Sequence, residues 1–253
     1  MIICSKSNQW LKLARALLKG SKESQKYFIA EGEKVIKALL PVYKPLVVLA
    51  QENFEFNLEE SFLTISVPIW PSETPSKILA IFERPNYALS DLQNAQDLII
   101  LDEIQDPGNL GSIIRTAVAA GWENLICLKN TANPFSPKVV RSSAGALGGL
   151  KIFSDFEIGS LTQILKENNF TLIYTSSHSE SKFNEINFKQ INKPCLILGN
   201  EGHGIQENLK QIIFNSGLNL LEANIPILKP QIVESLNVGI ASALLMYKIK
   251  NLI

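Results

Sequence analysis

The sequence has few of the residues that build metal and redox centres. Its three cysteines, Cys4, Cys127 and Cys195, are far apart, and no pair has the spacing of a zinc site or a redox motif. Cys127 and Cys195 lie in apolar, strand-like runs, so we expect them to be buried and reduced. The two histidines, His178 and His203, are isolated and are interpreted as ordinary loop residues. The sequence therefore predicts no metal site.

Long apolar runs are also missing. No run approaches the ~18 residues that a membrane helix needs, and the first residues lack the apolar core of a signal peptide. The 253 residues are 46% hydrophobic and 19% charged, which is typical of a globular protein with one large or two ordinary domains. We therefore expect a cytoplasmic protein that does not enter a membrane.

Two common nucleotide-binding motifs are absent. The chain has no G-x-x-x-x-G-K-S/T sequence, with which P-loop hydrolases hold phosphates. It also lacks G-x-G-x-x-G after an early strand, which argues against a Rossmann-type oxidoreductase. The glycine-rich sequence that is present, GNEGHG at residues 199–204, is a turn of another kind.

Apolar periodicity predicts two α/β domains, residues 1–90 and 91–253, joined by the polar, non-periodic stretch 84–97. In the first domain we predict helices over 7–20 and 32–40 and strands over 28–31, 46–50 and 78–82. In the second we predict strands over 98–101, 125–128, 172–175, 195–198 and 218–223, and helices over 110–120, 137–144, 161–167, 205–214 and 236–249. Such alternation predicts a mostly parallel sheet with helices on both faces.

Basic residues gather near the N-terminus. Residues 1–26 contain six basic residues and one acidic residue, although the whole chain has a net charge of zero. A helix would align Lys12, Arg15, Lys19 and Lys22 on one face. Such a face is either a solvated surface or a set of contacts to RNA phosphates.

Three polar turns in the second domain are expected to border one site. Asn109 opens a predicted helix, in the N-cap position, after a Pro-Gly pair that suits a type II turn. Glu201 lies within GNEGHG, directly after a predicted strand. Ser235 can cap the last helix, and Asn237 follows in its first turn, where packing does not explain an amide. Capping and tight-turn geometry alone would account for part of this pattern.

Arg115 interrupts a helix that is otherwise mostly apolar. It lies near Ile113, Ile114 and Ala117. An arginine in such a helix either extends to solvent along its aliphatic stem or holds an anion in a cleft. We favour the anion-holding interpretation.

Taken together, these turns resemble the three motifs of the SpoU (TrmH-like) ribose methyltransferases, in the same order along the chain. Motif one corresponds to LDEIQDPGNLGSIIRTAVAAG, motif two to LILGNEGHGI and motif three to IPILKPQIVESLNVGIA. The resemblance covers residues 98–250, and YFIAEGEKVIKALL near the N-terminus is similar to the family's ribosomal-protein-like RNA-binding domain.

The resemblance implies a SPOUT fold whose C-terminal chain forms a deep trefoil knot, which general rules of chain topology do not predict. It implies S-adenosyl-L-methionine as the methyl donor, methyl transfer to the 2′-hydroxyl of a ribose in RNA, and a homodimer whose active site draws on both subunits. The added N-terminal domain favours 23S rRNA over tRNA as the substrate.

The resemblance also implies residue roles. The catalytic set would be Asn109, Arg115, Glu201, Ser235 and Asn237. The cofactor would contact Thr175, Leu198, Gly199, Gly202, Ile225, Pro226, Ile227 and Leu236. The position of Arg115 has been cast as the general base in this family. Because a guanidinium gives up its proton so reluctantly, we assign Arg115 to positioning and charge stabilisation instead.

One segment departs from the family pattern. The stretch before Ser235 reads LKPQIVE, which is two residues longer than usual and contains no glycine. Because this loop would border the cofactor, its conformation and the cofactor affinity could differ. Gly239 replaces the usual serine or alanine, which should be harmless.

Other functions compete with this interpretation. A catalytically silent RNA-binding relative is disfavoured because all five polar motif positions are intact. A SPOUT enzyme that methylates a base is disfavoured by the N-L-G and S-L-N signatures, which favour ribose. A tRNA 2′-O-methyltransferase remains the main alternative for the substrate.

Overall fold

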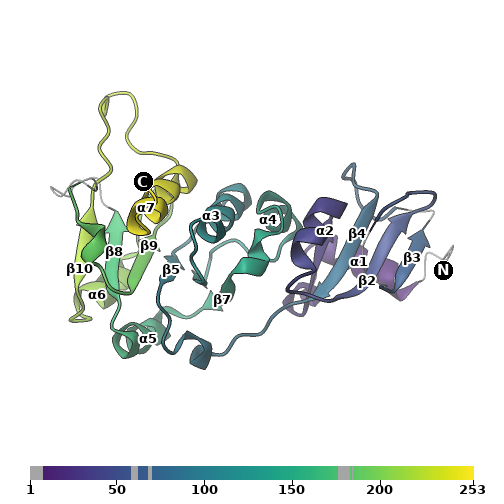
Figure 1. Cartoon of the computed structure of the whole chain (residues 1–253), viewed down its shortest axis with the longest axis horizontal. Coiled ribbons are helices and arrows are strands. Elements are labelled where there is room, and N and C mark those ends of the chain that lie inside the picture. Colours follow the sequence, from purple (N-terminus) through teal and green to yellow (C-terminus); the bar gives the residue numbers. More distant parts are fainter. Residues whose placement is uncertain (1–7, 58–61, 68–69, 176–182, 184) are drawn as a thin grey trace. The chain divides into compact units, whose positions relative to one another are not determined.

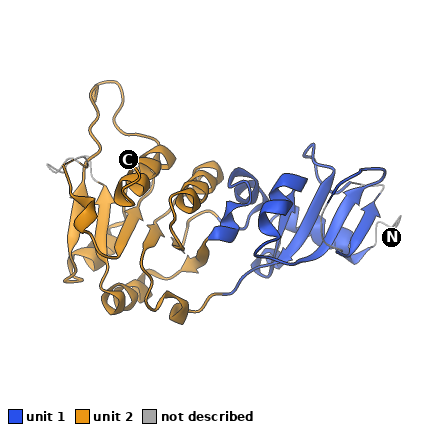
Figure 2. Ribbon diagram, in the orientation of Figure 1, with its two compact units in different colours: residues 1–86, 133–149 blue, residues 87–132, 150–253 orange. Residues whose placement is uncertain are grey.

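A computed structural model describes residues 8–57, 62–67, 70–175, 183 and 185–253. The chain forms two compact units, residues 1–86 with 133–149 and residues 87–132 with 150–253 (Figure 2). This division differs from the predicted domains, 1–90 and 91–253, in its boundary after residue 86 and in the place of one later segment. Residues 133–149, which include helix α4 (Pro137–Ser142), pack within the N-terminal unit. Cys4 and His178 lie outside the described residues.

The N-terminal unit contains a four-stranded sheet of order β1-β4-β2-β3. Its strands are β1 (Tyr27–Glu31), β2 (Pro45–Gln51), β3 (Thr64–Val67) and β4 (Ile78–Glu83). Strand β4 is antiparallel to both neighbours, and β2 is parallel to β3. Helix α1 (Gln9–Leu18) buries Leu11, Ala14 and Leu17 in a core shared with the sheet. Helix α2 (Glu33–Leu39) follows β1.

Helix α1 is shorter than the helix predicted over 7–20. The side chain of Asn8 caps it by accepting from the backbone nitrogen of Trp10 at 2.9 Å. The helix ends before Gly20, which takes a left-handed φ of 74°. Lys22 therefore begins a separate 3₁₀ turn (η1, Lys22–Gln25), and its predicted place on the same helical face as Lys12 is wrong.

The second unit contains a six-stranded sheet of order β10-β8-β9-β5-β6-β7. Every neighbouring pair is parallel, which confirms the predicted parallel α/β architecture. The strands are β5 (Leu98–Leu101), β6 (Asn124–Leu128), β7 (Lys151–Phe156), β8 (Thr171–Thr175), β9 (Pro194–Leu198) and β10 (Leu220–Ala223) (Figure 1). The predictions missed β3 and β7.

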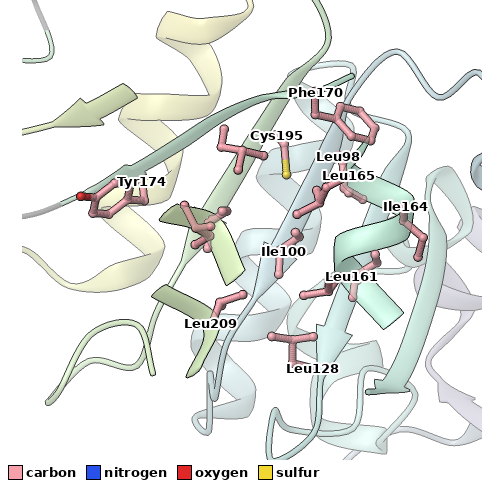
Figure 3. Close-up of a cluster of buried hydrophobic side chains, with 14 of the residues drawn as sticks. Leu98, Ile100, Leu128, Leu161, Ile164, Leu165, Phe170, Tyr174, Cys195 and Leu209 are labelled. Atoms are coloured by element: carbon pink, nitrogen blue, oxygen red, sulfur yellow. The ribbon is translucent and has the colours of Figure 1, made fainter. Parts of the chain in front are cut away.

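Helices cover both faces of this sheet. Helices α5 (Leu161–Asn168) and α6 (Glu207–Phe214) pack their apolar residues into the cluster shown in Figure 3, against Leu98, Ile100 and Cys195 of the strands. Helices α3 (Pro107–Ala119) and α7 (Val238–Ile249) pack against each other, and α7 also contacts β9. Cys127 and Cys195 are buried, as predicted, and burial raises the pKa of the Cys195 thiol.

Within the described ranges, no helix is both long and apolar enough to cross a bilayer.

The predicted linker 84–97 contains a short 3₁₀ helix (η2, Leu89–Leu92) that buries Leu92 completely. The trefoil knot implied by the family resemblance stays a prediction.

Candidate active site

The candidate site lies where the strand order of the parallel sheet reverses. From β5 the chain continues through β6 to β7 on one side, whereas β9, β8 and β10 lie on the other side. Leu101 at the end of β5 pairs with Leu198 at the end of β9. The loops after these two strands therefore leave the same edge side by side. In parallel α/β sheets such a switch point is where ligands bind.

Three polar side chains from distant parts of the sequence form a hydrogen-bonded chain there. The Nδ2 of Asn109 donates to Oε1 of Glu201 at 2.7 Å. The Nδ2 of Asn237 donates to Oδ1 of Asn109 at 3.0 Å. The structure thus brings together one residue from each of the three motifs, with Asn109 in the centre.

The start of helix α3 differs from the prediction. Asp106 is the N-cap, and its Oδ1 accepts from the backbone nitrogen of Asn109 at 2.8 Å. Pro107 and Gly108 occupy the first helical turn and do not form a type II turn. Asn109 is therefore not the N-cap. Because Asp106 caps the helix, the side chain of Asn109 is free to contact Glu201.

Helix α7 likewise begins with a different cap from the one predicted. The Oδ1 of Asn237 accepts from the backbone nitrogens of Gly239 at 2.9 Å and Ile240 at 3.4 Å. Ser235 is exposed, and its predicted capping role is wrong. The cap explains Asn237 structurally and also directs its amide nitrogen toward Asn109. A Cβ at Gly239 would lie 3.1 Å from this Oδ1 and 3.6 Å from Cβ of Ser112, so a larger residue would crowd the junction of α3 and α7.

Glu201 is presented by a closed turn. Asn200 and Gly204 exchange two backbone hydrogen bonds of 2.9 and 3.0 Å, and Gly204 has a left-handed φ of 72°. A Cβ at Gly199 would lie 2.4 Å from the carbonyl carbon of Gly204, so only glycine fits there. The Oδ1 of Asn200 also accepts from the backbone nitrogen of Gly202 at 2.8 Å. The exposed Glu201 therefore sits on a tightly constrained backbone.

A buried carboxylate that the sequence analysis missed anchors the far end of this turn. Asp102 is completely buried directly after β5. Its two oxygens accept from the backbone nitrogen and the Nε2 of Gln206, at 2.7 and 2.6 Å. Desolvation raises the pKa of Asp102, while the bonds from Gln206 oppose that rise. An acid directly following the apolar run LIIL was the signal that could have identified it.

Arg115 is exposed on helix α3, in its third turn because the helix begins at Pro107. Within the described part of the chain, it makes no hydrogen bond or ion pair. The two interpretations of Arg115 from the sequence, extension to solvent and the holding of an external anion, therefore both stay open. Its guanidinium faces solvent and remains available for an external anion.

The predicted cofactor residues lie at the same carboxyl edge of the sheet. Thr175 ends β8 and pairs with Ala223 of β10, and Tyr174 pairs with Ile197 of β9. Strands β10, β8 and β9 therefore end side by side. Ile225 and Ile227 follow β10, and Leu198 and Gly199 end β9. Five of the predicted cofactor residues therefore lie at or just after the ends of these adjacent strands, and we call them the strand-end row: Thr175, Leu198, Gly199, Ile225 and Ile227.

This row fits an adenosyl ligand in two respects. Ile225, Ile227 and Leu236 are half-buried apolar side chains, which suit a heterocyclic base, while Pro226 and Gly202 are exposed. Among the described residues, none forms a backbone hydrogen bond with Ile225 or Ile227.

The fold and this cluster define an α/β protein with a hydrogen-bonded polar cluster at the switch point of its parallel sheet. The sequence profile of the SpoU rRNA Methylase family matches residues 97–247. This chain belongs to that family of RNA methyltransferases. The oxidoreductase alternative is thereby excluded.

Individual relatives agree with this assignment. The chain is 28% identical to the 23S rRNA (guanosine(2553)-2′-O)-methyltransferase of Bacillus subtilis, over 97% of this chain and 96% of the relative. It is 31% identical to an uncharacterized tRNA/rRNA methyltransferase of Synechocystis, over 69% of this chain and 60% of that one.

Solved structures share the fold. The SpoU methyltransferase AviRb from Streptomyces viridochromogenes has a TM-score of 0.83 at 22% identity, covering 96% of this chain and 97% of its own. The AdoMet-bound rRNA methyltransferase from Sinorhizobium meliloti has a TM-score of 0.82 at 24% identity, covering 100% of this chain and 98% of its own.

Proposed function

We propose that this protein transfers a methyl group from S-adenosyl-L-methionine to the 2′-hydroxyl of a ribose in large-subunit ribosomal RNA. The observation that carries the proposal is the hydrogen-bonded chain of Glu201, Asn109 and Asn237 at the switch point of the sheet. It joins all three family motifs in one place. A relative named for 23S rRNA ribose methylation, which the chain matches over nearly its full length, supports ribose and rRNA over base methylation and tRNA.

The polar chain fixes the orientation of its members. The Oδ1 of Asn237 is held by the helix cap, so its Nδ2 points to Asn109. Asn109 must then turn its own Nδ2 toward Glu201. One carboxylate oxygen of Glu201 is thus occupied, and the other can accept a hydrogen bond from a bound ribose. Bound S-adenosylmethionine would supply an electrophilic methyl group, so positioning of the hydroxyl is the main task of these residues.

Arg115 is proposed to hold the RNA phosphate beside the target ribose. Its exposed guanidinium, with no partner in the described part of the chain, can grip a phosphate with two parallel hydrogen bonds. The role proposed for Ser235 is weaker, because it is exposed and takes no part in the polar chain. The cofactor is proposed to contact the strand-end row of Thr175, Leu198, Gly199, Ile225 and Ile227, together with Gly202, Pro226 and Leu236.

The N-terminal unit is proposed to bind the RNA substrate. Lys12 and Lys19 are exposed, Arg15 is half-buried, and Lys22 is exposed on the adjoining 3₁₀ turn. We propose that these four basic residues, called the cationic surface below, contact RNA although they do not share one helix. An RNA substrate of the ribosome also fits the cytoplasmic location expected from the sequence.

We further propose that the active protein is a homodimer. Leu228, Ile232 and Val233 of the LKPQIVE loop and Ile240 at the start of α7 are exposed by 93, 77, 45 and 57%. Such a concentration of exposed apolar residues near one site is typical of a contact surface. Replacing Leu228 and Ile232 by serine should shift sedimentation toward a monomer. An unchanged dimer mass would place the interface elsewhere.

The decisive experiment measures transfer of labelled methyl groups from S-adenosylmethionine to RNA. Unmodified ribosomal RNA and tRNA are offered separately to the purified protein, and the modified nucleotide is mapped. We expect label in large-subunit rRNA, resistant to alkaline cleavage at one ribose. Label in tRNA alone would favour the tRNA alternative, and no label in either RNA would favour a silent RNA-binding relative.

A further inference from the structure

The backbone of Glu103 has an unusual conformation beside the active-site turn. Glu103 follows the buried Asp102 at the end of β5 and has a φ of 57°. Residues other than glycine rarely adopt this left-handed backbone conformation, because their Cβ atom then crowds the backbone. A glutamate at such a position needs compensating contacts, and Glu103 has them.

Glu103 holds the turn that carries Glu201 at two points. Its backbone oxygen accepts from Nδ2 of Asn200 at 2.9 Å. Its carboxylate lies 3.2 Å from Nε2 of His203, and the Glu103 side chain is only 16% exposed. The other carboxylate oxygen accepts from Nδ2 of Asn130, in the loop after β6, at 2.8 Å.

These contacts continue directly into the polar chain of the site. Asn200, held by Glu103, directs its Oδ1 to the backbone nitrogens of Gly202 and His203, at 2.8 and 3.4 Å. Glu201 lies between Asn200 and Gly202 and reaches Asn109 from this backbone. The left-handed turn at Glu103 is what aims both its carbonyl and its carboxylate at the 200–204 turn. No hydrogen bond or ion pair joins Glu103 or His203 to Asn109 or Asn237, all four of which the structure describes.

We propose that Glu103 is a positioning residue for methyl transfer, which clamps the 200–204 turn through His203 and Asn200 and so fixes the carboxylate of Glu201. The proposal rests on the function proposed above. The carboxylate of Glu103 acts on the reaction only through the turn. Its loss should therefore lower kcat more than it raises KM for RNA, because the turn still exists but samples more conformations.

Glu103→Gly provides a sharp test because it separates positioning from stability. Glycine favours the left-handed φ, so the variant should unfold at the wild-type temperature or above, despite its lost contacts. We expect kcat on rRNA to fall about tenfold or more. We also expect faster amide hydrogen exchange in residues 199–206 of the free protein, a readout that needs neither cofactor nor RNA.

Two further variants complete the test. Asp155→Gly is the matched control, because Asp155 is an exposed acid with a φ of 55° in the same unit. It should leave kcat and the exchange of 199–206 unchanged. Glu103→Gln keeps oxygen and nitrogen atoms where the carboxylate was, so its amide oxygen can still accept a bond from Asn130 or His203. It should recover most of the activity that Glu103→Gly loses.

The outcomes distinguish this proposal from the proposed function. Wild-type kcat and unchanged exchange in Glu103→Gly would overturn the positioning role while leaving the methyltransferase function intact. A Glu103→Gln variant as slow as Glu103→Gly would also overturn it. If the wild-type protein methylates no RNA, the proposed function fails, and the exchange measurement still decides whether Glu103 clamps the turn.

Discussion

Asn109 and Glu201 are 92 positions apart in the sequence, yet their side chains meet at 2.7 Å. The contact exists because β5 and β9 are neighbours whose carboxyl ends are in register, so the loop after each strand starts at the same level. It also requires Asp106, and not Asn109, to cap helix α3. An amide at the centre of the site is thereby left free to orient a carboxylate.

The first prediction concerns Asn109→Ala. Removal of this amide should lower kcat about a hundredfold, or ~3 kcal/mol, because Glu201 and Asn237 both lose their partner. The affinity for S-adenosylmethionine, measured by calorimetry, should change by less than about threefold. Thr116→Ala in the same helix serves as the control and should be nearly wild type. A normal kcat for Asn109→Ala would contradict the central role of this amide.

A second prediction concerns Gly199→Ala and cofactor binding. The added methyl group would lie 2.4 Å from the carbonyl carbon of Gly204, so the 200–204 turn would have to move. We expect the affinity for S-adenosylmethionine to fall at least about tenfold, equal to ~1.4 kcal/mol. Gly159→Ala, where an added Cβ meets nothing within 4 Å, should bind the cofactor normally. Equal affinities in the two variants would show that the cofactor lies away from this turn.

Much of this architecture could be predicted because its strands are buried on both faces. The runs LIIL and CLIL are continuously apolar, which marks the central strands β5 and β9 clearly. Strand β7 was missed because KIFSDF is half polar and contains Asp155 in a left-handed conformation. The pairing of β7 with β6 also shifts in register, so buried and exposed side chains do not alternate regularly along β7.

The sequence predicts which polar residues belong to the candidate site, but it does not predict the hydrogen bonds between them. Motifs one and three each offer two N-cap candidates within a few residues, Asp106 or Asn109 in the first and Ser235 or Asn237 in the second of these motifs. Local sequence cannot decide between them, since both members of each pair are good caps. The choice depends on contacts between distant segments, and it determines which amide is free for the site.

The third prediction tests the cationic surface of the N-terminal unit. Changing Lys12, Arg15, Lys19 and Lys22 together to glutamine should weaken RNA binding and flatten its dependence on salt, because fewer counterions are released. Lys22 should contribute separately from the others, since it lies on the 3₁₀ turn that follows Gly20. Binding titrations at several salt concentrations measure the slope. If the variant and the wild-type protein show the same salt dependence of RNA binding, these residues form a solvated surface and do not contact RNA.

A fourth prediction concerns stability at the C-terminal helix. Lys250 lies 2.5 Å from Oδ2 of the buried Asp97 and 5.0 Å above the ring of Trp122. Lys250→Met should lower the free energy of unfolding by about 3 kcal/mol, because it leaves a buried carboxylate without its cation. Lys210→Met, which removes an exposed pair with Glu207, should cost less than about 1 kcal/mol. Denaturant titration compares the two, and similar losses would mean that Asp97 is stabilised mainly by other groups.

The last prediction is that Arg115→Ala strongly slows methyl transfer but preserves cofactor affinity. Arg115 is exposed, and within the described residues nothing occupies its guanidinium, so its removal should not destabilise the fold. The turns around Gly199 and Ile225, proposed to hold the cofactor, belong to other elements. Losing one charged contact to the phosphate beside the target ribose should lower the rate roughly a hundredfold, or ~3 kcal/mol.

Arg115→Lys refines this test, because lysine keeps the charge but cannot grip a phosphate with two parallel bonds. We expect it to recover only part of the lost rate, in single-turnover measurements on the mapped RNA. Full recovery would mean that charge alone matters at this position. Normal turnover of Arg115→Ala would instead mean that Arg115 is not needed for methyl transfer. The reaction would then depend mainly on Glu201 and Asn237, which share a hydrogen-bonded chain with Asn109.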